Sequence, residues 1–238
     1  MQTLLIPGFT QTVESWDAVA QALRDLGTQP RGCSIEECTT FSATADAMAN
    51  VYGRGTWVGY SMGGRIALMV ALSHAHLVEH LILVSATAGI ESSNERATRR
   101  AADEELAQSA IDVGTEAFLL RWLAQPMFAD VNTDAPGVSA RASINPQRLA
   151  HDLRVLGTGS MPNLWDRLGE LHMPVTIVTG ARDAKFSAIG VRMHECIADS
   201  RHISVQCGHA ILLERPGDLA KIIHDTHNAA ARNSEETN

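Results

Sequence analysis

Hydrophobic residues in this chain gather into short runs that are separated by longer amphipathic stretches. The runs TLLIP (3–7), TWVGY (56–60) and HLILVSA (80–86) are typical of buried strands, and helical spacing of apolar residues fills the stretches between them. Two later runs, PVTIVTG (174–180) and SRHISV (200–205), continue the pattern. Because strands that alternate with helices are typical of parallel βαβ units, the pattern predicts an α/β fold with a mostly parallel sheet flanked by helices.

Weaker patterns predict four further elements. GCSIEE (32–37) indicates a second strand, and VESWDAVAQALRDLG (13–27) indicates the first helix. SATADAMANVYG (42–53) indicates another helix, for which Ser42 is the expected N-cap. A last helix is expected from about residue 216 to residue 227.

The alternation of strands and helices stops between residues 87 and 164, where the sequence is charged, helix-like and without strand patterns. An insertion after a strand of a parallel sheet lies above the carboxyl ends of the strands, where such folds bind ligands. We therefore expect a core formed by residues 1–86 and 165–238, and a helical lid formed by residues 87–164.

Composition and charge narrow the class of protein. A chain of 238 residues with 45% hydrophobic content is large enough for one sizeable core. Neither a signal peptide nor a membrane span is indicated, so we expect a cytoplasmic protein. The net charge of −8 and the lack of a long basic run argue against a nucleic-acid partner. The four cysteines match no zinc spacing and are interpreted as reduced packing residues: Cys33, Cys38, Cys196 and Cys207.

The segment GYSMG (59–63) has the G-x-S-x-G pattern between an expected strand and an expected helix. In that setting a sharp turn exposes the serine hydroxyl at the end of the sheet, so Ser61 is the expected nucleophile or base. The N-terminus of the following helix favours negative charge beside Ser61. A plain loop serine among glycines is the alternative, and the strand and helix on either side argue against it.

A serine hydroxyl needs a histidine to accept its proton and an acid to orient that histidine. Asp183 follows the strand 174–180, and His209 follows the strand 200–205. Because both positions lie at strand ends, in the order serine, acid, histidine, we expect these three side chains to converge at one edge of the sheet. Asp199 is the rival acid, and it is the weaker candidate because it follows a helix.

Two backbone N–H groups would form an oxyanion hole beside Ser61. One is expected from Met62, the residue after the serine, and the other from Phe9 in the loop PGFT (7–10). An ordinary strand-ending turn is the alternative interpretation of this loop.

Taken together, these features resemble the α/β-hydrolase superfamily over the whole chain. Several segments also resemble the family of 2-succinyl-6-hydroxy-2,4-cyclohexadiene-1-carboxylate synthases, which eliminate pyruvate from their substrate. Pro7 departs from that family, which often has a histidine at this place. The matching segments are GYSMGGR (59–65), ERATRRAAD (95–103), RWLAQPMFA (121–129), ARASINPQRLAHDL (140–153) and GARDAKF (180–186).

The resemblance to these synthases implies five substrate-binding residues: Tyr60, Arg65, Arg99, Trp122 and Arg141. A substrate of the family has three carboxylates, and the arginine guanidinium matches a carboxylate with two parallel hydrogen bonds. The expected partner is therefore a small polycarboxylate.

Position along the helices bears on two of these arginines. Arg65 is four residues after Ser61 and lies on the same face of the expected helix. For Arg99 an alternative stays open, because Arg96, Arg99 and Arg100 could form a solvated helix face with neighbouring acids.

The resemblance implies a carbon-oxygen lyase of menaquinone biosynthesis. His209 would take the proton of Ser61, and the serine alkoxide would then remove a proton beside the substrate ketone. No metal or organic cofactor is required. Two alternatives stay open, namely a serine carboxylic ester hydrolase that acts on a small anionic ester and a ligand-binding receptor on the same fold.

Overall fold

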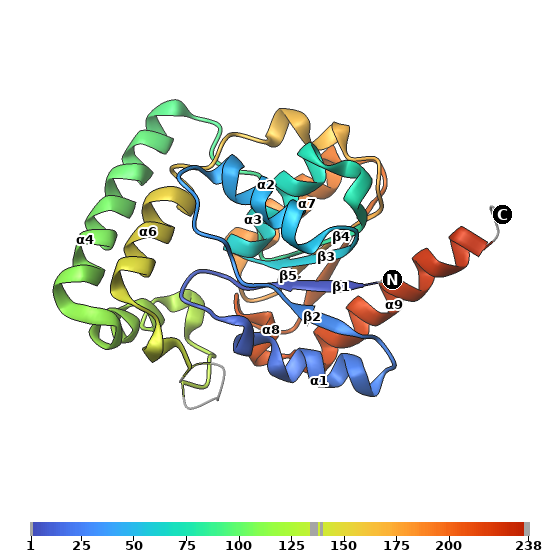
Figure 1. Ribbon diagram of the computed structural model, residues 1–238, viewed down its shortest axis with the longest axis horizontal. Helices are drawn as coiled ribbons and strands as arrows, with labels where there is room; N and C mark the ends of the chain where they lie inside the picture. Colours follow the sequence, from blue (N-terminus) through green and yellow to red (C-terminus); the bar gives the residue numbers. More distant parts are fainter. Residues whose placement is uncertain (1, 134–137, 139, 236–238) are drawn as a thin grey trace.

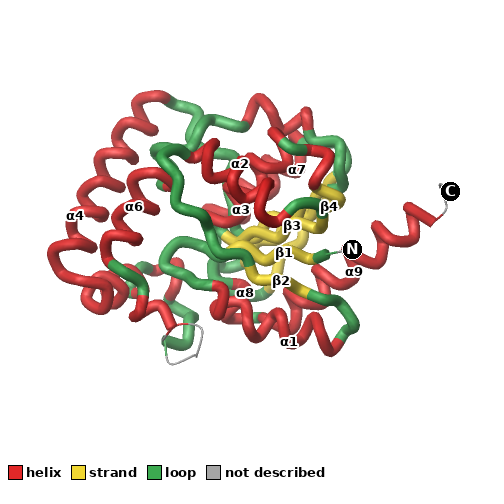
Figure 2. Tube along the Cα trace, in the orientation of Figure 1, coloured by secondary structure: helices red, strands yellow, loops and turns green. Residues whose placement is uncertain are grey.

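The computed structural model describes residues 2–133, 138 and 140–235. Its centre is a six-stranded sheet in which every pair of neighbouring strands is parallel (Figures 1 and 2). The strands follow one another across the sheet in the order β2-β1-β3-β4-β5-β6. Their bounds are β1 (Thr3–Ile6), β2 (Pro30–Gly32), β3 (Gly55–Tyr60), β4 (Val78–Val84), β5 (Val175–Gly180) and β6 (Ser200–Val205).

Helices cover both faces of this sheet (Figure 1), and each face has its own apolar cluster. One cluster lies under α2, α3 and α7 and includes Leu68, Leu81 and Leu83. The other lies under α1, α8 and α9 and includes Val58 and Ile82. The predicted α/β class is therefore confirmed. The helices are α1 (Asp17–Asp25), α2 (Phe41–Tyr52), α3 (Met62–Ser73), α7 (Ala184–Cys196), α8 (Ile211–Glu214) and α9 (Pro216–Glu235).

The strand order places a topological switch point between β1 and β3. The chain leaves β1 toward β2 on one side, whereas β3 continues the sheet on the other side. Loops that leave neighbouring strands in opposite directions create a crevice at the carboxyl ends of the strands. Phe9 follows β1 and Ser61 follows β3, so both residues lie at the edge of this crevice.

Five predicted strands are confirmed within two residues, but the prediction for residues 32–37 is wrong. Strand β2 pairs with β1 from Pro30 to Gly32, the N–H of Cys33 donates one more hydrogen bond of 2.9 Å to the carbonyl of Leu5, and the chain then leaves the sheet. Cys33 and Ile35 are nevertheless buried in the core. The alternation of apolar residues in this segment therefore reflects the packing of an extended loop and not ladder pairing.

The predicted helix ends differ from the observed ones in detail. The hydroxyl of Thr40, and not that of Ser42, caps α2 by accepting a hydrogen bond of 3.1 Å from the backbone N–H of Ala43. The expected first helix begins with a 3₁₀ turn, η1 (Val13–Trp16), before α1. Helix α9 continues beyond the expected end at residue 227.

The described part of the segment between β4 and β5 consists of helices joined by turns and loops and contains no strand. Its two long helices pack against each other around a small apolar cluster that includes Ala107, Phe118 and Leu153 (Figures 1 and 2). Gly114 has φ 77° and breaks the regular backbone of α4. The exact division between lid and core stays a prediction. These helices are α4 (Ser93–Leu123) and α6 (Pro146–Leu156), with the 3₁₀ turns η3 (Pro126–Phe128), η4 (Ala140–Ser143) and η5 (Trp165–Glu170).

The described ranges contain no helix that combines the length and the apolar character needed to cross a membrane.

Candidate active site

Ser61 lies at a sharp turn between β3 and α3. Its backbone has φ 50° and ψ −107°, a conformation that costs a non-glycine residue about 1–3 kcal/mol. The glycines around it are required by close backbone approach. A Cβ atom on Gly63 would overlap the carbonyl oxygens of Ile6 and Pro7, and one on Gly59 would overlap the carbonyl of Gly63. The fold therefore maintains a strained turn that presents the serine hydroxyl.

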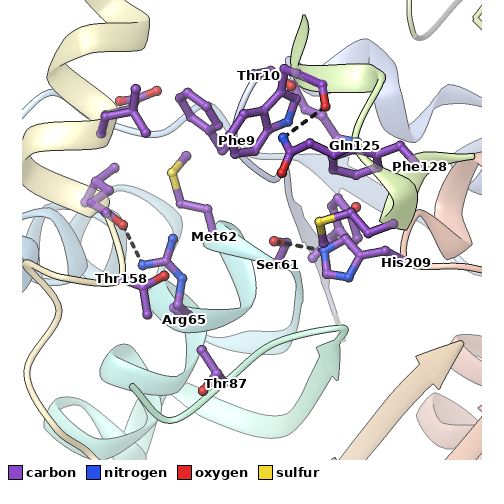
Figure 3. Close-up of a pocket in the computed structure, with 18 of the residues that line it drawn as sticks. Phe9, Thr10, Ser61, Met62, Arg65, Thr87, Gln125, Phe128, Thr158 and His209 are labelled. Carbon is purple, nitrogen blue, oxygen red and sulfur yellow. Dashed lines mark hydrogen bonds between the residues drawn. The ribbon is translucent and has the colours of Figure 1, made fainter. Parts of the chain in front are cut away.

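Ser61, His209 and Asp183 come together at the carboxyl edge of the sheet. The Nε2 atom of His209 lies 3.3 Å from the Oγ atom of Ser61 (Figure 3). On the other side of the ring, Nδ1 lies 2.6 Å from the Oδ2 atom of Asp183. The distances allow proton transfer from the hydroxyl to the imidazole while the carboxylate orients the ring.

The environment of His209 restricts its movement and its contact with water. The residue is 1% exposed, and the ring of Phe186 lies 4.5 Å from the imidazole, centroid to centroid. The rings of Tyr60 and Phe128 lie at 5.4 Å and 5.8 Å. Asp183 is held as well, because its Oδ1 accepts a hydrogen bond of 3.2 Å from the backbone N–H of Phe186 at the start of α7.

The rival acid Asp199 lies at the opposite edge of the sheet. It directly precedes β6, and its carbonyl accepts a hydrogen bond from the N–H of Val175 at the beginning of β5. The structure thus places Asp183, and not Asp199, beside His209.

A cavity of about 200 Å³ opens beside the Ser61 hydroxyl. Phe9 and Met62, the two expected oxyanion donors, both line it (Figure 3). Met62 is the first residue of α3, and N–H groups in the first turn of a helix have no partner within the helix. Their roles in an oxyanion hole stay predictions.

Positive charge dominates the wall of the cavity. Four cationic side chains line it, and the only acidic side chain among the described lining residues is that of Asp152. The cations are Arg65, Arg99, Arg141 and Lys185. A cavity of this composition is suited to an anionic ligand with several charges.

Arg65 is 7% exposed and forms no salt bridge among the described residues. One guanidinium nitrogen donates a hydrogen bond of 2.5 Å to the carbonyl of Leu156 in α6. Burial, together with the nearby positive charge of Arg99, lowers the pKa of Arg65 to about 10. A bound anion would stabilise a guanidinium in this position.

Arg141 is even more enclosed, with an exposed fraction of 2%. Its Nε has no hydrogen-bond partner among the described residues, and its one described hydrogen bond is a long contact of 3.4 Å from Nη1 to the hydroxyl of Thr10. Burial lowers the pKa of Arg141. This buried and nearly unpaired cation is costly to the fold unless a ligand pairs with it.

Arg99 differs from its two neighbours on α4. It lines the cavity, and its Nε donates a hydrogen bond of 2.8 Å to the Oδ1 atom of buried Asp103. Arg96 instead donates to backbone carbonyls of the loop before the helix, and Arg100 donates to the carbonyl of Gly159. Neither of these two lines the cavity. The geometry therefore favours Arg99 over the other two as a ligand-binding residue.

The two aromatic residues implied by the resemblance also line the cavity. Tyr60 is fully enclosed, and burial raises the pKa of its phenol. The ring of Trp122 packs edge-on against Phe9, with 4.9 Å between the ring centroids. Together they form apolar wall beside the serine, and their part in binding stays a prediction.

Sequence reasoning missed several lining residues, among them Asp152, Gln125, Lys185 and Phe186. For Asp152 the sequence did contain a signal. Leu149 and Leu153 form an apolar stripe on α6, and Asp152 interrupts that stripe at helical spacing. The others lie inside quoted motifs but have no pattern that separates them from surface residues.

Among the described residues, no group of three or more His, Cys, Asp and Glu side chains is arranged to hold a metal ion.

Comparisons with known proteins identify relatives of this chain. Residues 3–222 match the model of the alpha/beta hydrolase family. A 2-succinyl-6-hydroxy-2,4-cyclohexadiene-1-carboxylate synthase of Escherichia fergusonii is 31% identical over 164 residues, covering 68% of this chain and 64% of that protein. A Bacillus subtilis protein, provisionally named the same synthase, is 36% identical over 174 residues, covering 71% of this chain. The match spans 64% of that protein as well, less than two thirds of its length.

Among solved structures, MenH from S. aureus superposes on this chain with a TM-score of 0.88 at 26% identity. The superposition covers 97% of this chain and 94% of that protein. The agreement includes the helical segment between β4 and β5, because so little of either chain is left out.

Proposed function

The chain belongs to the alpha/beta hydrolase family, and we propose that it is a carbon-oxygen lyase in which Ser61 acts as a base. The substrate is 2-succinyl-5-enolpyruvyl-6-hydroxy-3-cyclohexene-1-carboxylate, and the products are pyruvate and 2-succinyl-6-hydroxy-2,4-cyclohexadiene-1-carboxylate. The similarity to synthases that form the second product supports this choice. Menaquinone biosynthesis is then the role of the enzyme.

The observation that carries the proposal is the pair of buried guanidinium groups, those of Arg65 and Arg141, in the cavity of the serine. Neither has a carboxylate partner among the described residues. A pocket for neutral esters gains nothing from such groups, whereas a substrate with three carboxylates supplies the partners they lack. Arg99 provides a third cation at the same cavity.

The proposed reaction begins with the activation of Ser61. His209 takes the proton of the Ser61 hydroxyl, and Asp183 stabilises the imidazolium that results. The serine alkoxide removes the ring proton next to the succinyl ketone. The negative charge then moves to the ketone oxygen, where the N–H groups of Phe9 and Met62 stabilise it.

The enolate then eliminates the enolpyruvyl group. Electrons return from the enolate through the ring double bond, a second ring double bond forms, and the carbon-oxygen bond to the enolpyruvyl group breaks. The leaving group takes a proton and becomes pyruvate. No bond forms between Ser61 and the substrate, and the proton on His209 is available for the leaving group.

Pyruvate release tests the proposal directly. The substrate is incubated with the protein, and pyruvate is followed with lactate dehydrogenase and NADH. We expect Ser61→Ala and Arg65→Ala each to reduce the rate by at least about 10²-fold, since one removes the base and the other a buried charge partner. Arg96→Ala is the matched control, because this arginine does not line the cavity. Equal losses in Arg96→Ala and Arg65→Ala would contradict the proposal.

A small-ester hydrolase is the second candidate, because the same three side chains also suit acyl transfer. It predicts a burst of p-nitrophenol from p-nitrophenyl acetate that disappears in Ser61→Ala. Such a burst together with no pyruvate from the cyclohexene substrate would favour this candidate.

A further inference from the structure

One acidic side chain, that of Asp152, lines a cavity in which the other charged side chains among the described residues are cationic. It lies on α6 and is 7% exposed, on the stripe by which that helix packs on the rest of the molecule. Asp152 also borders a second cavity, which it shares with Thr10, Gln11 and Met62 at the boundary of the first. A carboxylate at this place repels anionic ligands, so its presence indicates a role other than the binding of anions.

Asp152 is held from behind by Arg148. The Nε atom of Arg148 donates a hydrogen bond of 2.9 Å to Oδ1 of Asp152. The same guanidinium donates to the carboxylate of Glu37 at 3.0 Å and to the carbonyl of Ile35 at 2.7 Å. These contacts fix Arg148 on the core, so one oxygen of Asp152 is fixed as well.

The second oxygen of Asp152 has a different environment. Oδ2 has no hydrogen-bond partner among the described residues, although the side chain lines the cavity. Burial raises the pKa of Asp152 to about 6, and the charge of Arg148 limits that rise. The ion pair with Arg148 favours the carboxylate form, and a carboxylate accepts hydrogen bonds but donates none.

From this geometry we infer that Asp152 is a specificity-determining residue that accepts a hydrogen bond from a hydroxyl group of the ligand. The inference rests on the proposed function, whose substrate and cyclic product both have a ring hydroxyl beside their carboxylates. Arg65, Arg99 and Arg141 then bind the carboxylates, and Asp152 binds the hydroxyl. Repulsion by Asp152 also keeps a carboxylate from occupying the place of the hydroxyl, which fixes the orientation of the ring.

Two ligands, one with this hydroxyl and one without it, provide the test. The cyclic product, 2-succinyl-6-hydroxy-2,4-cyclohexadiene-1-carboxylate, has the hydroxyl. The aromatic compound 2-succinylbenzoate has the same ketone and the same two carboxylates but lacks the hydroxyl. Titration calorimetry gives the dissociation constant of each, and the ratio of the two constants measures the preference for the hydroxyl.

We expect the wild-type protein to bind the hydroxylated ligand about 10- to 100-fold more tightly, the range for one hydrogen bond to a charged acceptor. Asp152→Leu continues the apolar stripe of α6 and removes the acceptor, so the ratio should fall to about 1. Asp152→Asn keeps the shape and one weaker acceptor, so its ratio should lie in between. Rate measurements should agree, with KM for the cyclohexene substrate rising more than kcat falls.

Glu37→Gln is the matched control for a purely structural role. Glu37 contacts the same Arg148 but lines neither cavity. The substitution should leave the ratio unchanged, whatever it does to thermal stability. A ratio near 1 in the wild-type protein, with both ligands bound and both lost in Arg65→Ala, would overturn the inference but keep the proposed function. Failure of both ligands to bind the wild-type protein would overturn the two together.

Discussion

Replacement of Arg141 by methionine separates the effect of this buried cation on the free energy of unfolding from its effect on ligand binding. Arg141 is 2% exposed, and its Nε has no partner among the described residues. Its one described hydrogen bond, to Thr10, is 3.4 Å long. Methionine has a similar length and fills the same space without a charge, so Arg141→Met removes the guanidinium and leaves most of the packing in place.

The structure gives the sign and the size of both effects. A buried polar group that lacks adequate partners costs about 1–3 kcal/mol, and burial lowers the pKa of Arg141 for the same reason. Arg141→Met should therefore raise the free energy of unfolding by about 1–3 kcal/mol. If Arg141 binds a carboxylate, the same substitution removes about 2–5 kcal/mol from binding, which lowers kcat/KM by roughly 30-fold to several thousand-fold.

Two assays check these opposite signs. Urea unfolding without ligand measures stability, and pyruvate release from the cyclohexene substrate measures kcat/KM. Arg154→Met is the control, because Arg154 lies on the neighbouring helix α6 in an exposed salt bridge with Glu104. It should change both quantities little, since such bridges contribute about 0–1 kcal/mol. Loss of stability in Arg141→Met together with unchanged kcat/KM would refute the reasoning, because Arg141 would then be a structural residue.

Three further predictions concern the turn at Ser61, helix α4 and the sheet. Gly63→Ala should destabilise the protein by more than about 2 kcal/mol in urea unfolding, because its Cβ would overlap backbone oxygens; wild-type stability would contradict the geometry of the turn. Arg99→Ala should raise KM for the cyclohexene substrate about tenfold or more, whereas Arg96→Ala should not. Equal KM values in these two variants would show that Arg99 does not bind the substrate. Burial lowers the pKa of His80 from 6.5 to about 4, so the unfolded chain takes up the proton first and stability should fall by up to roughly 3 kcal/mol as the pH drops from 6.5 to 4. His80→Gln should lose less stability than the wild type over that range of pH, and exposed His172→Gln, the control, should lose as much; identical curves for His80→Gln and the wild type would contradict this account.

Much of the candidate site follows from local sequence signals. Ser61, Asp183 and His209 each come after an apolar strand, and parallel strands place such residues at one edge whatever the details of packing. Arg65 follows from Ser61 by helical geometry alone. The sequence thus predicted which of these side chains would lie together. The structure places Ser61, Arg65 and His209 at one cavity, with Asp183 hydrogen-bonded to the far side of the His209 ring.

The remaining features depend on contacts between distant segments. Asp152 meets the cavity only because α6 packs over the carboxyl ends of the strands, and Arg148 reaches Ile35 from 113 residues away. The end of β2 depends on how far β1 can pair with it, which residues 32–37 do not reveal. Local patterns report which face of an element is apolar, but they do not report what another element brings to that face.

The mass of the intact protein during turnover tests most directly whether Ser61 acts as a base. Samples are quenched while pyruvate is being released, and the protein mass and the pyruvate yield are measured together. The account predicts one pyruvate for each substrate consumed and an unchanged protein mass throughout. A mass gain that matches a fragment of the substrate, absent in Ser61→Ala, would show acyl transfer through Ser61 and would contradict the account.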